Sequence, residues 1–352
     1  MKVETLLPLG KVDPGLRAPE VALDIRRVGE DAALVESLGY DGLMVEDTKQ
    51  DPFVVMALAA QATRRIKVGT AVAIAFPRSP MVTAMTAWTL AKLARGRFTL
   101  GLGTQVKGHI ERRFGVKWSA PGPWMREYVQ ALRAIWTAWQ HGTPLDFAGD
   151  HYRLNLLVPL FTPDAIEHPD IPIHLAAVNP YLCQVAGEVA DGVRPHPVCT
   201  PHYIREVMLP AVRKGAARAG RTLDNFQVAI KPLIATAPDA DRLVARIRDV
   251  RARVSFYAST PAYRACFEAH GLGDVARELS ALSRAQRWEE MPERISDEVL
   301  NLYATVGTYD EIVPKLLHRY RGLVTNVEFS IPTPDEAACA TLSRMVRALQ
   351  AE

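Results

Sequence analysis

The chain has 352 residues, of which 48% are hydrophobic and 23% are charged, values that are typical of a folded globular protein and exclude a disordered or collagen-like chain. Its 42 basic and 39 acidic residues leave a formal net charge of +3, and no long segment concentrates one sign. The charge pattern therefore gives no support to a nucleic-acid partner or to a membrane-surface role.

The first part of the chain alternates short apolar runs with longer segments of helical spacing, which is typical of βαβ units. Strands are predicted over Lys2–Leu7, Gly42–Val45, Ile66–Ala73 and Arg97–Leu102. Helices are predicted over Glu20–Leu38, Pro52–Ala62, Met81–Leu93 and Trp124–Gln140. The two sets alternate, so four βα units are visible before residue 141.

The second part continues the alternation less regularly. Strands are predicted over Ile173–Ala176, Gly192–His196, Gln227–Leu233 and Val327–Ile331. Helices are predicted over Pro180–Ala190, Pro201–Ala219, Asp239–Val254, Tyr309–Tyr320 and Pro334–Leu349. Eight such units predict an α/β protein, a single-domain (β/α)8 TIM barrel over residues 1–352. Insertions near 143–169 and 255–305 are expected at the rim as loops or lids.

The start of the chain, MKVETLLPLGKVDPG, is interrupted by glycine and proline before the apolar core of a signal peptide can form. No stretch of about 18 apolar residues occurs anywhere. The cysteines Cys183, Cys199, Cys266 and Cys339 lie far apart without a CxxC pair, and the nine histidines lack metal-ligand spacing. We therefore expect a cytoplasmic protein with reduced thiols, no membrane partner and no metal.

Common catalytic motifs are missing from the sequence. It contains no GxxxxGK[ST] loop, HExxH pair or GxSxG elbow, and the segment Gly101-Leu-Gly103 lacks the third glycine of a dinucleotide fingerprint. The segments after the predicted strands, where a barrel places its active site, are poor in acids, bases and metal ligands. Such a mouth suits a large flat cofactor that supplies the chemistry itself.

Five blocks of the sequence carry a family resemblance. They are LGYDGLMVEDTKQDPF, RIKVGTAVAIAFPRSP, GRFTLGLGTQVKGHIERRFG, IPIHLAAVNP and AGEVADGV, and the C-terminal GTYDEIVPKLLHRYRG extends the match over nearly the whole chain. The chain resembles the luciferase-like oxidoreductase family, the flavin and deazaflavin TIM barrels. Within that family it is most similar to the branch that uses coenzyme F420, a 5-deazaflavin.

The resemblance implies a role for the end of the second strand, which in the family commonly carries Asp-His near the reactive face of the ring. Asp47 matches the aspartate and is a candidate catalytic residue, while Thr48 replaces the histidine and is a candidate cofactor contact. A threonine cannot act as a general base at neutral pH, so a mechanism built on that histidine does not carry over. Alternatively, Asp47 is a turn or helix-capping residue.

The resemblance also implies cofactor contacts at the end of the third strand. In the family a non-proline cis peptide there pushes one residue against the back of the ring. By position this bond is Ala71–Val72, and Thr70, Ala71 and Val72 are candidate contacts. The alternative is a plain buried strand end.

After the fourth strand, Gly103, Thr104 and Gln105 match the family's turn beside the cofactor. Small residues in such a turn let the backbone approach the ring. Some deazaflavin enzymes carry a glutamate acid just beyond it, where this chain has Val106. His109 is the candidate catalytic proton donor or acceptor, since its ordinary pKa is near 6.5; equally, it is a helix-face histidine bonded to backbone.

The block LAAVNP matches the family's loop for the cofactor phosphate, which makes Ala177, Val178 and Asn179 candidate phosphate contacts. A helix that starts at the following proline would favour an anion at its N-terminus. The alternative is an ordinary βα turn. His196, after the sixth strand, either flanks the same cofactor tail or is a core histidine with satisfied hydrogen bonds.

These observations lead to an expected oxidoreductase that exchanges a hydride between coenzyme F420 and a small organic substrate. One alternative is an FMN-dependent monooxygenase that uses O2 and a partner reductase; another is a barrel without catalysis that only binds a cofactor. The resemblance implies a homodimer, with Met56, Met81, Met85 and Trp88 as apolar interface candidates. Lys231, Arg253 and Tyr257 either contact an anionic substrate or are solvated.

Overall fold

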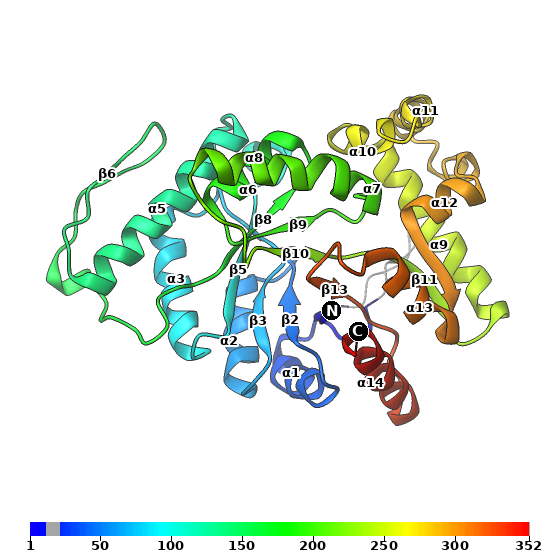
Figure 1. The fold of residues 1–352 in the computed structure, drawn as a ribbon, viewed down its shortest axis with the longest axis horizontal. Helices are drawn as coiled ribbons and strands as arrows, with labels where there is room; N and C mark the ends of the chain where they lie inside the picture. The colour runs from blue at the N-terminus through cyan, green and yellow to red at the C-terminus, as the bar shows by residue number, and fades with distance from the viewer. Residues whose placement is uncertain (12–21, 352) are drawn as a thin grey trace.

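The computed structural model describes residues 1–11 and 22–351. Eight parallel strands form a closed barrel, in which β3 pairs with β5 to close the ring. These strands are β1 (Lys2–Leu6), β2 (Gly42–Val45), β3 (Lys67–Thr70), β5 (Phe98–Gly103), β8 (Ile173–Ala177), β9 (Gly192–Pro195), β10 (Gln227–Ile230) and β13 (Asn326–Glu328). The expected (β/α)8 TIM barrel is therefore confirmed, and helices surround it (Figure 1).

The covering helices bury the outer face of the strands, and so the strands are apolar on both faces. All six residues of β5, for example, are buried. The helices are α1 (Val28–Ser37), α2 (Pro52–Ala62), α3 (Pro80–Leu93), α5 (Pro121–His141), α6 (Pro180–Val189), α8 (Leu209–Arg218), α13 (Tyr309–Tyr320) and α14 (Glu336–Gln350). Several begin with a polar cap followed by proline, as at Asp51, Ser79 and Asn179.

The barrel interior carries one buried ionic group among the apolar side chains. Glu4 accepts hydrogen bonds from Arg194 (3.1 Å) and Asn326 (2.6 Å) across the barrel. A side chain at Gly42 would place its Cβ 3.0 Å from Glu4 Cγ, so the glycine leaves room for this pair. Burial lowers the pKa of His174 well below its ordinary value and Arg194 lowers it further, so this ring is neutral.

Two insertions extend the barrel at opposite ends of the view in Figure 1. The first carries a hairpin of β6 (Phe147–Ala148) and β7 (Arg153–Leu154), which projects from the barrel. The second follows β10 and contains a separate parallel pair, β11 (Leu233–Ala237) and β12 (Ala304–Thr308). Its helices are α9 (Ala240–Ser259), α10 (Arg264–Glu268), α11 (Gly273–Arg284) and α12 (Asp297–Tyr303).

Several predicted boundaries were wrong. Residues 20 and 21 of the first predicted helix lie outside the described residues, and the described helix begins only at Val28, after a 3-10 turn over Ile25–Arg27. The predicted strand Ile66–Ala73 is divided into β3 and β4 (Ala73–Ile74). The predicted helix Pro201–Ala219 contains a π-helical turn at Ile204–Met208 before α8.

The seventh strand also differs from its prediction. The chain leaves the barrel after β10, because residues 231 and 232 interrupt the strand, and resumes as β11. Its partner β12 was not predicted at all. Among the described residues, no helix is long and apolar enough to cross a membrane.

The expected interface residues divide into two groups. Met56 is buried in the core (0% exposed), so the prediction that it offers apolar surface was wrong. Trp88 is 3% exposed, yet it lines an apolar groove together with Met81 and Met85. Met85 is 54% exposed and Met81 is half-buried.

Candidate functional site

The register shows that the third strand bulges where it reaches the barrel mouth. Gly69 pairs with Thr99 on β5, and Ala73 pairs with Leu102 on the same strand. The path between these pairs takes four steps along β3 and β4 but only three along β5. One extra residue is therefore accommodated, which bends the strand and re-aims the side chains near it.

The Thr70 hydroxyl replaces the missing ladder contacts in this bulge. It donates to the Gly101 carbonyl (2.7 Å) and accepts from the Gly101 amide (2.9 Å). The Ala71–Val72 peptide bond is cis, which confirms what the family resemblance implied. Val72 then lies against the fourth strand: a Cβ on Gly103 would be 2.7 Å from Val72 Cγ2.

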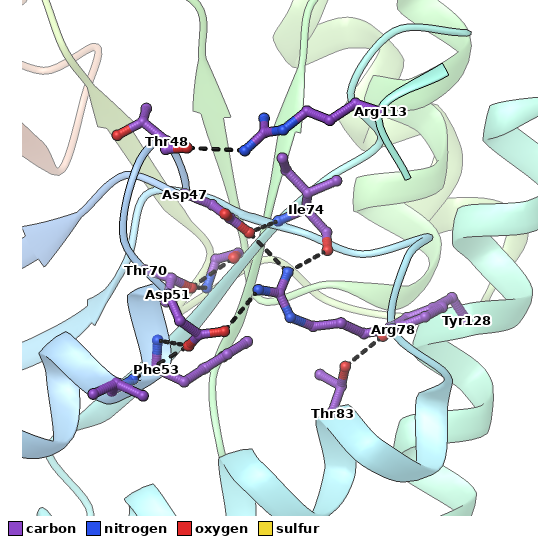
Figure 2. Close-up of polar contacts among 12 residues, drawn as sticks. Asp47, Thr48, Asp51, Phe53, Thr70, Ile74, Arg78, Thr83, Arg113 and Tyr128 are labelled. Atoms are coloured by element: carbon purple, nitrogen blue, oxygen red, sulfur yellow. Dashed lines mark hydrogen bonds and ion pairs between the residues drawn. The ribbon is translucent and has the colours of Figure 1, made fainter. Parts of the chain in front are cut away.

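Asp47 holds the bulged segment in place. Its Oδ2 accepts hydrogen bonds from the Ile74 amide (3.0 Å) and from Arg78 Nη1 (2.7 Å), and its own amide donates to the Val72 carbonyl (3.3 Å). Figure 2 shows the carboxylate pointing at the Arg78 guanidinium. Asp47 is only 8% exposed and Arg78 19%, so water competes little for this ion pair.

Arg78 holds the loop after β2 and the end of β4 together, and we call this set of contacts the clamp. It also donates to the Ile74 carbonyl (2.9 Å) and to Asp51 Oδ2 (3.1 Å), and its guanidinium lies 5.2 Å from the ring centre of Phe53. Asp51 in turn caps α2 through the Phe53 amide (2.9 Å). The segment after β2, with Asp47 and Asp51, is thus joined to Ile74 at the end of β4 through one guanidinium, as Figure 2 shows for these residues.

The turn after β5 forms the next part of the mouth. Gln105 has a left-handed backbone (φ 55°), and the Thr104 hydroxyl donates to its carbonyl (3.1 Å). Arg113, just beyond the short helix α4 (Lys107–Arg112), donates to the Thr48 carbonyl (2.9 Å) and ties this segment to the end of β2. His109 lies on α4 with an exposed side chain that makes no hydrogen bond within the described residues.

The loop between β8 and α6 leads into a capped helix N-terminus. The Asn179 side chain accepts from the Leu182 amide (2.9 Å) and so caps α6, with proline at the next position. The amides of Val178, Asn179 and Tyr181 donate no hydrogen bond within the described residues. Amides at a helix N-terminus favour an anion by donor geometry and dipole.

His196 follows β9 and is fixed by residues of the second insertion. Its ring stacks on Tyr263 (centroids 4.0 Å apart) and meets Tyr257 edge-on (4.7 Å). Burial lowers the pKa of His196 to about 3, with a further contribution from Lys231. The ring is therefore neutral, and its Nδ1 accepts from the Val198 amide (3.4 Å).

An ionic cluster that the sequence did not predict crosses the mouth. Glu46, directly before Asp47, accepts from Lys11 (2.8 Å) on one oxygen and from Lys231 (3.1 Å) on the other. Burial alone would raise the Glu46 pKa, but the two ammonium groups outweigh it and lower the pKa to about 2. Glu46 is thus ionised at every physiological pH.

Comparisons with known proteins decide the family. The family model described as luciferase-like monooxygenase matches residues 1–326. The chain belongs to the luciferase-like monooxygenase family.

Two relatives of this luciferase-like chain and one solved structure of similar fold are informative. The uncharacterized protein Rv1360 of Mycobacterium tuberculosis is 42% identical over 303 residues, 86% of this chain and 89% of that protein. The F420-dependent glucose-6-phosphate dehydrogenase of Nocardia farcinica is 30% identical over 252 residues, 66% and 71% of the two chains. The solved coenzyme F420 dependent tetrahydromethanopterin reductase from Methanopyrus kandleri aligns with a TM-score of 0.74 at 20% identity, over 99% and 98% of the two chains.

The expected site residues of this luciferase-like barrel fall into two sets. Contacts and register bring together the segments with Asp47, Thr48, Thr70–Val72 and Gly103–Gln105. Ala177 ends β8, Val178 and Asn179 follow it, and His196 follows the neighbouring strand β9. The His109 side chain makes no hydrogen bond to any of them within the described ranges. Within the described residues, no group of three or more His, Cys, Asp or Glu side chains could hold a metal ion.

Sequence reasoning missed Arg78, Lys11 and Glu46 as parts of the mouth. Arg78 stands inside the block RIKVGTAVAIAFPRSP, and the signal that could have found it is a lone arginine just after a predicted strand end. Glu46 and Lys11 lie in strand-end segments that had been described as poor in acids and bases. That description was wrong at these two positions, because their partners are distant in the sequence.

The clamp leads to a prediction about stability. Replacing Arg78→Met leaves the mostly buried Asp47 carboxylate without its cation, and should lower the unfolding free energy by about 2–4 kcal/mol. Urea unfolding at pH 7 measures this. The control Arg26→Met removes an exposed pair with Asp24 and should produce no measurable change. Equal midpoints for Arg78→Met and the wild type would contradict the clamp.

The Glu46 cluster leads to a prediction about pH. A folded pKa of about 2 lies below the ordinary value of 4.5, so ionised Glu46 stabilises the fold above pH 4.5, and this contribution is lost as the pH falls toward 2. The unfolding free energy of the wild type relative to Glu46→Gln should therefore shrink between about pH 5 and pH 3. The exposed Glu111→Gln is measured alongside as the control for a change of surface charge. A difference for Glu46→Gln that stays constant over this pH range would argue against the cluster.

Proposed function

We propose that this protein is an oxidoreductase that exchanges a hydride between coenzyme F420 and a small organic substrate. The observation that carries the proposal is its similarity to relatives named as F420-dependent, in sequence and in fold. The site is consistent with it. Asp47 is engaged with Arg78 and Ile74, so the one acid expected to react at the second strand positions the chain instead.

The described residues fit a deazaflavin or flavin. The amides at the start of α6 suit the phosphate of the cofactor tail. Val72, lying over Gly103, presents an apolar wall at the bulge where the tricyclic ring would rest. Coenzyme F420, when bound, supplies or accepts the hydride at C5. Gln105 and its neighbours form the adjacent turn, where backbone groups can approach the ring.

His196 contributes a hydrogen-bond donor on the side of the mouth opposite the bulge. Since Nδ1 of the neutral ring accepts from the Val198 amide, the proton resides on Nε2. That N–H can orient a carbonyl or hydroxyl of a ligand without changing charge over the physiological range. Tyr263 and Tyr257 keep the ring in this orientation and exclude water from one face.

A second candidate is a monooxygenase that receives reduced FMN from a partner reductase and uses O2. The observation that favours it is the description of the matching family, luciferase-like monooxygenase. The phosphate cradle and the apolar wall would serve FMN equally, because the two cofactors share the tricyclic ring and the ribityl phosphate. The affinity for each cofactor and the consumption of oxygen therefore distinguish the two candidate functions.

The cofactor proposal is tested by anaerobic titration with coenzyme F420 and FMN, each oxidised and reduced, followed by fluorescence or calorimetry. We expect F420 to bind at micromolar concentration and more tightly than FMN. Gly103→Ala places a methyl group 2.7 Å from Val72 Cγ2 and should weaken F420 binding about tenfold or more by displacing that wall. Gly29→Ala, whose Cβ meets only an ordinary contact at 3.6 Å, should leave binding unchanged.

Each outcome of that titration has a meaning. Preference for reduced FMN, together with substrate-dependent oxygen consumption, would replace the F420 proposal by the monooxygenase. Failure of the wild type to bind any of the four species would refute both.

We also propose that the protein acts in the cytoplasm as a homodimer. All four cysteines are free thiols, which is usual in a reducing compartment. The support for a dimer is an apolar groove of about 630 Å3 between α3 and the segment that follows the hairpin. None of its lining residues is charged, and Leu160 and Phe161 are 85% and 74% exposed. Such a patch on a folded chain is typical of an interface, and a second copy presents the same uncharged surface.

Placing a charge in this apolar groove should produce monomers. Met85→Glu and Leu160→Glu each place a charge in the groove, and burying that charge in a dimer would be strongly unfavourable. Sedimentation at micromolar concentration should show a dimer for the wild type and monomers for both variants. Val244→Glu, at a 67% exposed position on α9, should remain dimeric. A monomeric wild type would reject the proposal.

A further inference from the structure

A small polar cavity opens at the carboxyl ends of β1, β10 and β13, on the side of the mouth away from the bulge. Its volume is about 40 Å3. The side chains that line it and carry charge or a hydroxyl group include Thr5, Lys11, Lys231, Thr236, Arg246 and Glu328. A water molecule occupies roughly 10–15 Å3 by such a measure, so the cavity has room for a polar head group and not for a whole substrate.

Three of these side chains are cations from separate elements. Lys11 follows β1, Lys231 follows β10, and Arg246 projects from α9. Acidic residues hold each of them: Glu46 binds both lysines, Glu328 lies 4.0 Å from Lys231, and Asp249 lies 3.0 Å from Arg246.

Glu46 and Asp249 do not line the cavity, whereas the three cations do. The three positive groups therefore share the lining with the carboxylate of Glu328, while Glu46 and Asp249 balance their charge from outside it. An ammonium group has three N–H donors, so the bond from Lys11 to Glu46 does not use all of its capacity.

One buried hydroxyl group provides an independent observation. Thr236 is 6% exposed, and its Oγ1 has no hydrogen-bond partner among the described residues. The residue lines the cavity from β11. Buried polar atoms are rarely left without a partner, because the unmet bond costs free energy. A ligand with an oxygen acceptor would satisfy this hydroxyl.

We propose that this cavity binds an anionic group, a carboxylate or a phosphate, that the substrate carries. The inference rests on the proposed oxidoreductase function, because it assigns the substrate class of that same site. Glu46, which binds Lys231 of the cavity, directly precedes Asp47 in the chain. Lys231 also lies close enough to His196 to affect its ring electrostatically. A substrate anchored here would therefore extend its reacting carbon toward the cofactor side of the mouth.

The test uses sodium phosphate and sodium acetate as probes, with the shift in thermal unfolding midpoint as the readout. Titrations are run at constant ionic strength on the full chain, with and without saturating coenzyme F420, so that the cofactor's own phosphate site is blocked in one arm. We expect one of the two anions to bind in both arms. The tighter probe identifies the class: phosphate indicates a phosphorylated substrate, and acetate a carboxylic acid.

Three variants assign the binding to this cavity. Lys11→Met should weaken the tighter probe about tenfold or more through loss of a charge-assisted hydrogen bond. Thr236→Val retains shape and charge and should weaken it several-fold, which keeps the test valid if Lys11→Met does not fold. Lys214→Met removes an exposed lysine far from the cavity and should have no effect.

The proposal is overturned if neither anion binds, or if Lys11→Met and Thr236→Val bind as tightly as the wild type. Direct F420 binding, followed by fluorescence in the same preparations, is a separate readout. Lost anion binding with intact F420 binding would refute the anion site alone. The reverse result would refute the F420 proposal and leave a cavity that binds anions.

Discussion

The ion pair between Asp47 and Arg78 is the contact on which the cofactor side of the mouth depends. The third strand carries one residue too many for its neighbour, so its ladder is disrupted there; the Thr70 hydroxyl and the Ala71 amide hold the start of the bulge, and the segment beyond it needs further bonds. Asp47 supplies them from the adjacent strand through the Ile74 amide and the guanidinium. Because Asp47 also donates its amide to Val72, the position of the apolar wall follows from the same group.

In this arrangement the aspartate at the end of the barrel strand has a structural role, although its position in the sequence suggests a catalytic one. From the sequence alone, Asp47 has the chemistry of an acid or base, and only the position of Arg78, thirty-one residues later, shows that one of its oxygens, Oδ2, is occupied. Asp51 looks equally reactive but caps α2. The barrel, its strand order and the segments at the mouth could be predicted from hydrophobic periodicity and from the family blocks, because both depend on short stretches of chain.

The features that could not be predicted depend on pairs distant in the sequence. Lys231 reaches Glu46 across the barrel from 185 positions away, and neither residue stands in a recognisable motif. The strand β12 was missed because it follows α12 directly and pairs outside the barrel with β11, so no βα alternation marks it. His196 is another example: its strand position was predictable, but its neutral ring follows from burial and Lys231.

The two halves of the mouth thus differ in the groups that they offer to a ligand. On the side of β3, β5 and β8 the chain offers backbone amides, a glycine and a small apolar wall, and its one carboxylate is neutralised by Arg78. On the side of β1, β10 and β13 it concentrates lysines, an arginine and glutamates around the unmet hydroxyl of Thr236. A flat cofactor is held well by the first kind of surface, since shape and backbone donors suffice for it. The desolvation cost of the second kind is offset by the carboxylates that pair with its cations, so a ligand there would have to use donors that these pairs leave over, such as the remaining N–H groups of Lys11.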